Sequence, residues 1–196
     1  MTKPTKISKG SPLPPVPLAL LSPCILILGP YFLNKHALGA VATTPALPSP
    51  DVLAVVARTA ALLLLLVAIK GFTTATLRIA ELNFSTPEDY KTFGFKLPDS
   101  WARGQPDPNE RIARWQRAHR NDGECIPYFL AILLVSALVS PDVSLLTGWT
   151  SMYVAMRALH TASYVWENQQ RPIFWAMSWG AAFGLASYVL IATSVL

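Results

Sequence analysis

Polar residues recur at helical spacing in the segment 114–129, which reads "RWQRAHRNDGECIPYF" and leads into an apolar run. An α-helix turns by about 100° per residue, so a 3, 4, 3 spacing keeps side chains on one face, here about 80° wide. In this projection Asp122 points away from the face. Ionisable residues beside a membrane span are costly, so this face is expected to line a bundle interior or a water-filled cleft. The four residues of this polar stripe are Arg114, Arg117, Asn121 and Glu124.

The residue types of the polar stripe indicate what it could bind. The planar fork of an arginine suits a carboxylate, a glutamate suits an ammonium group, and an asparagine offers a peptide both a donor and an acceptor. A small anionic peptide with a free amino group fits this set, and glutathione is the abundant cytosolic example. The alternative is a solvated cluster that touches lipid headgroups through Arg111, Arg114, Arg117 and Arg120.

A second polar pattern lies in "MRALHTASYVW", where Arg157, His160 and Tyr164 share a helical face. Taken alone, His160 and Tyr164 fit packing or interhelical hydrogen bonding equally well. An earlier apolar segment contributes Lys70 and Arg78. Charges from three predicted helices are therefore expected to converge at one face of a membrane.

The composition indicates the elements that carry these residues. Of the 196 residues, 52% are apolar and only 14% are charged, which is typical of a membrane protein and far from the soluble average. A bilayer core needs roughly 20 mostly apolar residues per helix. We therefore predict an all-α, polytopic membrane four-helix bundle, in which the polar front of the second segment continues the helix into water. The four segments are Asp51 to about Ala80, Glu124 to Ser140, Val143 to Trp166, and Pro172 to Leu196.

The first fifty residues are predicted to be an extension outside the domain that spans residues 51–196. An apolar run at 16–33, broken by prolines, follows a basic start with three lysines. It fits a signal sequence with a cleavage site at Ala40-Val41-Ala42, or equally a signal anchor that forms a fifth span.

Positive charge predicts the orientation of the bundle. The loop at 83–109 contains Lys91, Lys96 and Arg103, whereas the turn at Pro141-Asp142 has no basic residue. The first and third loops are thus expected in the cytosol. The net charge of +5 then follows from juxtamembrane residues and not from nucleic-acid binding.

The sequence contains no pattern typical of a metal site, a phosphate-binding loop or a disulfide framework. The two cysteines, Cys24 and Cys125, both lie in apolar surroundings. Glutathione, as a co-substrate, is the only cofactor that we expect.

Three segments resemble the membrane-associated proteins in eicosanoid and glutathione metabolism, the MAPEG family. "RWQRAHRNDGECIPYF" looks like the family's Arg-Ala-x-x-Asn-x-x-Glu signature with its following proline. "TPEDYKTFG" is similar to the first cytosolic loop of microsomal glutathione transferase and prostaglandin E synthase, and "RALHTASY" is similar to their third helix. The resemblance extends from about residue 51 to residue 196.

The resemblance implies a homotrimer in the endoplasmic reticulum, or in an outer mitochondrial or plastid membrane, with glutathione bound between subunits near the cytosolic face. It implies a transferase that detoxifies lipophilic electrophiles or lipid hydroperoxides taken from the membrane lipid. The glutathione-binding residues would be Arg78, Arg117, Arg120, Asn121, Glu124, Arg157, His160 and Tyr164.

The sequence departs from the family in ways that bear on the reaction. The prostaglandin synthase branch has an Arg-Ser pair where this chain has Phe174 and Trp175. Arg171 stands seven residues after Tyr164, the offset of the catalytic arginine in the leukotriene C synthase branch, so the resemblance makes these two residues the catalytic candidates. Cys125 replaces that branch's tyrosine. The alternatives to a transferase with peroxidase activity are a prostaglandin-E-type isomerase and a non-enzymatic lipid-binding scaffold like the lipoxygenase-activating protein.

Overall fold

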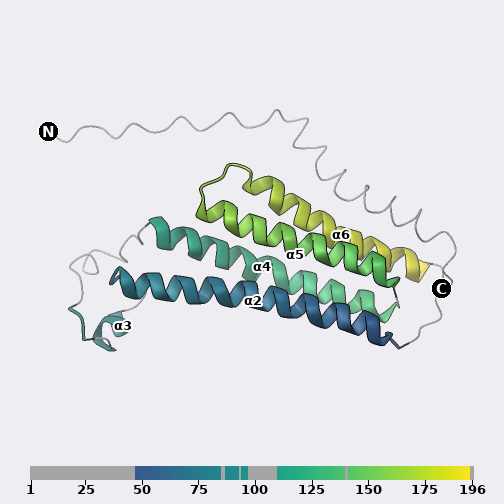
Figure 1. Ribbon diagram of the computed structural model, residues 1–196, viewed down its shortest axis with the longest axis horizontal. Helices are drawn as coiled ribbons and strands as arrows, with labels where there is room; N and C mark the ends of the chain where they lie inside the picture. The colour runs from purple at the N-terminus through teal and green to yellow at the C-terminus, as the bar shows by residue number, and fades with distance from the viewer. Residues whose placement is uncertain (1–46, 85–86, 93, 97–109, 140, 195–196) are drawn as a thin grey trace.

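Four long helices run side by side in alternating directions in the computed structural model, which describes residues 47–84, 87–92, 94–96, 110–139 and 141–194 (Figure 1). The predicted all-α four-helix bundle is confirmed. The extension at 1–46, with its predicted signal sequence or fifth span and Cys24, lies outside the described residues. The elements are α2 (Pro50–Ala80), α3 (Pro87–Thr92), α4 (Glu110–Leu138), α5 (Val143–Val165) and α6 (Arg171–Ser194).

Local sequence explains where the long helices begin. The Ser49 hydroxyl accepts a hydrogen bond from the Val52 N–H at 3.3 Å, and Pro50 occupies the first helical position of α2, where its missing N–H costs nothing. Asp142 caps α5 in the same way, because its carboxylate accepts from the Leu145 N–H at 2.9 Å. Pro127 lies inside α4, a position that neighbouring helices make tolerable in a membrane bundle.

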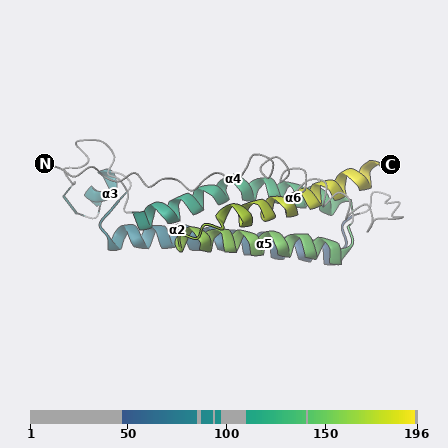
Figure 2. The same ribbon diagram turned by 90° about the horizontal axis from the view of Figure 1, so that it is seen from above.

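The helices pack in two layers, α2 with α5 and α4 with α6 (Figure 2). The Phe129 and Tyr153 rings stack in the core with centroids 3.5 Å apart. Helices α5 and α6 approach closely at Gly184, where an added Cβ atom would lie 2.7 Å from the Trp149 indole. The remaining core is aliphatic and includes Leu63, Leu133, Leu146 and Leu185.

Three of the four predicted spans meet the length and apolarity expected of a membrane helix in the described residues: α2, α4 and residues Arg171–Thr193 of α6. Helix α5 is long enough but is not among them, because it carries a row of buried polar residues. Those residues face the other helices and not the lipid. They are Thr150, Arg157, His160, Thr161 and Ser163.

Candidate functional site

The charged segments meet at one end of the bundle. The C-terminal end of α2, the N-terminal end of α4 and the turn between α5 and α6 all lie at that end, where α3 lies next to α2 (Figure 1). Alternating helix directions produce this arrangement, since every second connection returns to the same side. The expected convergence of charges from three helices is therefore present.

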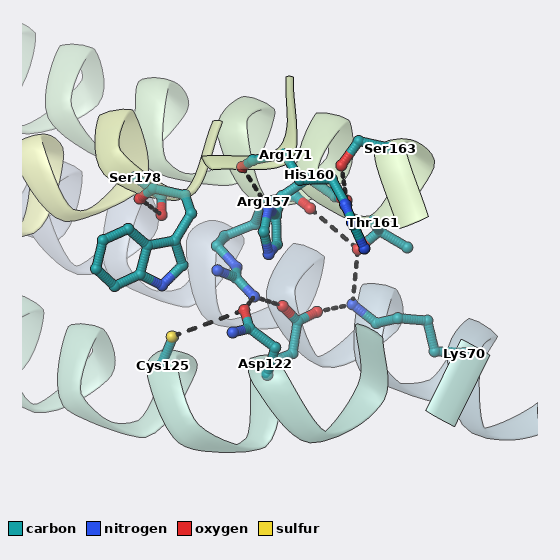
Figure 3. Close-up of polar contacts among 11 residues, drawn as sticks. Lys70, Asp122, Cys125, Arg157, His160, Thr161, Ser163, Arg171 and Ser178 are labelled. Carbon is teal, nitrogen blue, oxygen red and sulfur yellow. Dashed lines mark hydrogen bonds and ion pairs between the residues drawn. The ribbon is translucent and has the colours of Figure 1, made fainter. Parts of the chain in front are cut away.

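A cluster of three ionised side chains lies inside this half of the bundle. Lys70, Asp122 and Arg157 each have no exposed side-chain surface, and the Asp122 carboxylate forms ion pairs with both cations (Figure 3). Lys70 Nζ also donates to Thr161 Oγ1 at 3.1 Å, and the Thr161 hydroxyl donates to the Arg157 carbonyl at 3.0 Å. Two cations on one carboxylate leave one positive charge buried without a counter-ion in the cluster.

The buried cluster extends to the polar stripe through Asn121. Arg157 Nη2 donates to Asn121 Oδ1 at 2.6 Å, and the same oxygen lies 3.9 Å from the Cys125 sulfur. The Asn121 carbonyl therefore faces the interior, while its amide nitrogen has no partner among the described residues. Cys125 is a buried free thiol.

Arg117 and Glu124 of the polar stripe, and the adjacent Arg120, lie on the outside of the single chain. Arg117 is 42% exposed and donates to Glu110 at 2.6 Å, and Glu124 and Arg120 are exposed. Arg114 pairs with Glu167 in the turn between α5 and α6. Of the two environments expected for the stripe, a bundle interior or a water-filled cleft, the interior of this single chain does not hold Arg117 or Glu124, and the cleft stays a prediction. The interior face of α4 is the neighbouring one, which carries Ala118, Asp122, Cys125, Phe129 and Leu133.

His160, Tyr164 and Arg171 form a second group at the same end. The Arg171 guanidinium carbon lies 5.0 Å from the centre of the Tyr164 ring, and the His160 ring meets that ring edge-on at 5.1 Å. His160 Nδ1 lies 3.0 Å from the Arg171 carbonyl oxygen, which can only accept. A hydrogen bond to this oxygen requires a proton on Nδ1, so in the neutral ring Nε2 is an acceptor, and it has no partner among the described side chains.

Arg78 lies in the last turn of α2, at the charged end. Its half-buried side chain forms no hydrogen bond or ion pair with the described residues. The structure therefore brings Arg78 to the same end as the other predicted residues without joining it to either group.

The helical projection did not predict that Asp122 lies in the core and pairs with Lys70 and Arg157. The signal that could have found it is the lysine within "LLLLLVAIKG", because a cation in an apolar helix needs an anion on a neighbouring helix. No group of three or more potential metal ligands occurs in the described part of the chain.

The chain is similar to known proteins over most of its helical part. A family model described as "MAPEG family" matches residues 53–191. Microsomal glutathione S-transferase 1 of Sus scrofa is 32% identical over 119 residues, which cover 60% of this chain and 75% of that protein. The Bos taurus and Homo sapiens proteins of the same name are each 31% identical over the same shares. The chain, whose described residues include three helices long and apolar enough to cross a bilayer, therefore belongs to the MAPEG family of membrane proteins.

Proposed function

We propose that this protein is a membrane-bound glutathione transferase that joins the glutathione thiolate to lipophilic electrophiles and also reduces lipid hydroperoxides. The similarity to proteins named microsomal glutathione S-transferase 1 supports this reaction class. The observation that carries the proposal is the placement of Arg171 against Tyr164, with the Arg171 carbonyl facing His160.

In this proposal Arg171 and Tyr164 stabilise the thiolate. A free thiol has a pKa near 8.5, so only a small fraction is ionised at neutral pH, and the thiolate is the nucleophile. A guanidinium and a phenol that both donate to the sulfur would favour the ionised form. His160 positions the start of α6, because its Nδ1 atom lies 3.0 Å from the carbonyl oxygen of Arg171.

The polar stripe would hold the rest of glutathione. Arg117 and Arg120 would pair with its carboxylates, Glu124 would accept from its ammonium group, and Arg78 would add positive charge from α2. The exposure of Arg117, Arg120 and Glu124 on the outside of one chain supports a site that a neighbouring copy completes, as in a homotrimer. Asn121 would donate to a peptide carbonyl, and Arg157 would act by fixing the Asn121 side chain.

Both reactions need only glutathione and the lipophilic substrate. With chlorodinitrobenzene as a model electrophile, the thiolate sulfur bonds to the ring carbon, the carbon–chlorine bond breaks, and chloride leaves while the thiol proton passes to water. With a hydroperoxide, the thiolate sulfur bonds to the outer oxygen, the oxygen–oxygen bond breaks, and the leaving alkoxide takes up the proton that the thiol lost and becomes an alcohol. The sulfenic acid that forms on glutathione then reacts with a second glutathione thiol, which gives the disulfide and releases the oxygen as water. The lipophilic substrate would reach the site from the bilayer.

The test is turnover of the full chain in lipid nanodiscs with glutathione and chlorodinitrobenzene. Arg171→Ala and Arg171→Lys should both lower kcat more than glutathione affinity, because lysine keeps the charge but loses the planar fork. Tyr164→Phe should retain the ring packing and lose only the hydroxyl donor. Lys91→Ala, which removes an exposed charge from α3 at the same end, is the matched control.

Three results would contradict the proposal or the role of its main residue. Binding of glutathione without turnover of electrophiles or hydroperoxides would redirect the search to an isomerase. Absence of both binding and turnover would favour a lipid-binding scaffold. Equal turnover in wild type and both Arg171 variants would remove this residue from the reaction.

A further inference from the structure

A groove lies between α2 and α5, in the half of the bundle away from the charged end. It has a volume of about 250 Å³, and its lining is mainly apolar. Val55 and Leu62 from α2 face Val154 and Ala155 from α5 across it. The polar lining consists of one guanidinium and four hydroxyl groups, from Arg58, Thr59, Thr147, Thr150 and Ser151.

Arg58 has no counter-ion within the described part of the chain. Its side chain is exposed and forms no hydrogen bond or ion pair there. Asp51 lies seven residues earlier on α2, about 10 Å along the axis, and does not pair with it. The Asp142 carboxylate is already bound by its own helix cap. Residues 1–46 contain neither aspartate nor glutamate, so the extension offers no side-chain carboxylate either.

The depth of Arg58 makes an uncompensated charge costly. It lies eight residues into α2, about 12 Å from the first residue and inside a helix apolar enough to span a bilayer. Side chains on a helix lean toward its N-terminus, so the guanidinium leans toward the nearer membrane surface. At that surface the abundant anion is the phosphate group of a phospholipid.

The hydroxyl groups of α5 complement this anion. Thr147 and Ser151 are four residues apart on one helical face, are exposed, and have no side-chain hydrogen bond to the described residues. A guanidinium fork pairs well with phosphate oxygens, and hydroxyls can donate to the same group. The aliphatic lining below them suits an acyl chain.

We propose that this groove is a binding site for an anionic phospholipid, with the phosphate on Arg58, Thr147 and Ser151 and an acyl chain between α2 and α5. Selectivity for an anionic lipid follows from the charges. Arg58 is the one charged residue among the described residues of the lining. The cationic choline group of phosphatidylcholine would find no carboxylate among the described lining residues and would lie beside the guanidinium. The site is separate from the charged end, because Lys70 is twelve residues further along α2, about 18 Å away.

The test is native mass spectrometry of the full chain after reconstitution in equimolar phosphatidylglycerol and phosphatidylcholine and extraction in mild detergent. Wild type should retain phosphatidylglycerol in preference to phosphatidylcholine. Arg58→Gln should retain one phosphatidylglycerol fewer per chain, with affinity at least about tenfold weaker, or about 1.4 kcal/mol. Lys91→Gln removes an equal charge outside the groove and should retain lipid as wild type does.

Other headgroup contacts at the arginine-rich end of α4 are present in every variant, so they cancel in this comparison. If Arg58→Gln does not fold, the double variant Thr147→Val, Ser151→Ala removes the two hydroxyls and should also weaken retention. Equal retention by wild type and the groove variants would overturn the site. So would equal retention of both lipids, or no retained lipid in any variant.

Discussion

Arg157 on α5 and Asp122 on α4 form an ion pair in which neither side chain has any exposed surface. Lys70 on α2 joins the same carboxylate, so one aspartate links three helices (Figure 3). Burial of charges is costly unless they are paired, which makes the carboxylate the member that the cluster cannot lose. Arg157 is in turn bonded to Asn121, so the cluster connects the core to the polar stripe.

Removal of the Asp122 charge should destabilise the protein more than removal of Lys70. Asp122→Asn leaves two buried cations without an anion and should cost about 3–5 kcal/mol. Lys70→Met leaves the Arg157–Asp122 pair, which is neutral overall, and should cost less. Thermal unfolding in detergent measures the order, with Glu88→Gln on α3 as an exposed control. Equal losses in the two core variants would contradict the shared-carboxylate account.

Glu124 should contribute to glutathione affinity. Its exposed carboxylate lies on the outer face of α4, and loss of a contact with the ammonium group should weaken binding by about 1–3 kcal/mol in Glu124→Ala. Glu124→Gln keeps an acceptor without the charge and should be intermediate. Titration with glutathione checks this, and Glu88→Ala serves as the control. Unchanged affinity in Glu124→Ala would exclude this residue from the site.

Gly184 should not tolerate a side chain. A Cβ atom there would lie 2.7 Å from the Trp149 indole, so Gly184→Ala should separate α5 from α6 and cost about 1–3 kcal/mol. Gly148→Ala is the matched control, because nothing lies within 4 Å of its added Cβ. That variant should be neutral or stabilised by up to about 1 kcal/mol. Unfolding midpoints of the two variants separate a steric effect from a general effect of alanine.

Asp142 should make the start of α5 sensitive to acid. The Ser144 hydroxyl and the Leu145 N–H donate to its carboxylate and hold its pKa below the ordinary value of 3.8. A lowered pKa in the folded state means that the stabilisation is present above the unfolded pKa and is lost as the pH falls through the folded value.

Asp142→Ala should therefore destabilise the protein at pH 7 by about 1 kcal/mol, and the difference from wild type should shrink below about pH 3.8. Asp142→Asn keeps a capping oxygen without the titration, so its stability should change less over this range. Unfolding midpoints between pH 2 and pH 7 measure both effects. A constant difference between wild type and Asp142→Ala would contradict the role of the carboxylate.

Much of the fold follows from the sequence, because apolar length and capping residues are local properties. The predicted segment from Asp51 to about Ala80 corresponds to α2, and the segment beginning at Val143 corresponds to α5. The second segment begins earlier than its apolar part, at Glu110, as expected from its polar front. The sequence predicts four segments that span the membrane, but only three of the described helices are apolar enough. Helix α5 is the exception, because its polar residues are buried against other helices.

The sequence by itself determined which residues of α4 share a face, since a helix fixes the angles between its own side chains. It did not determine which face turns inward. Only the tertiary structure decided that, because the rotation of α4 depends on Lys70 and Arg157, which other helices carry. Their charges draw Asp122 into the core and leave the neighbouring face, with Arg117 and Glu124, on the outside. The periodicity of one helix contains no information about those partners.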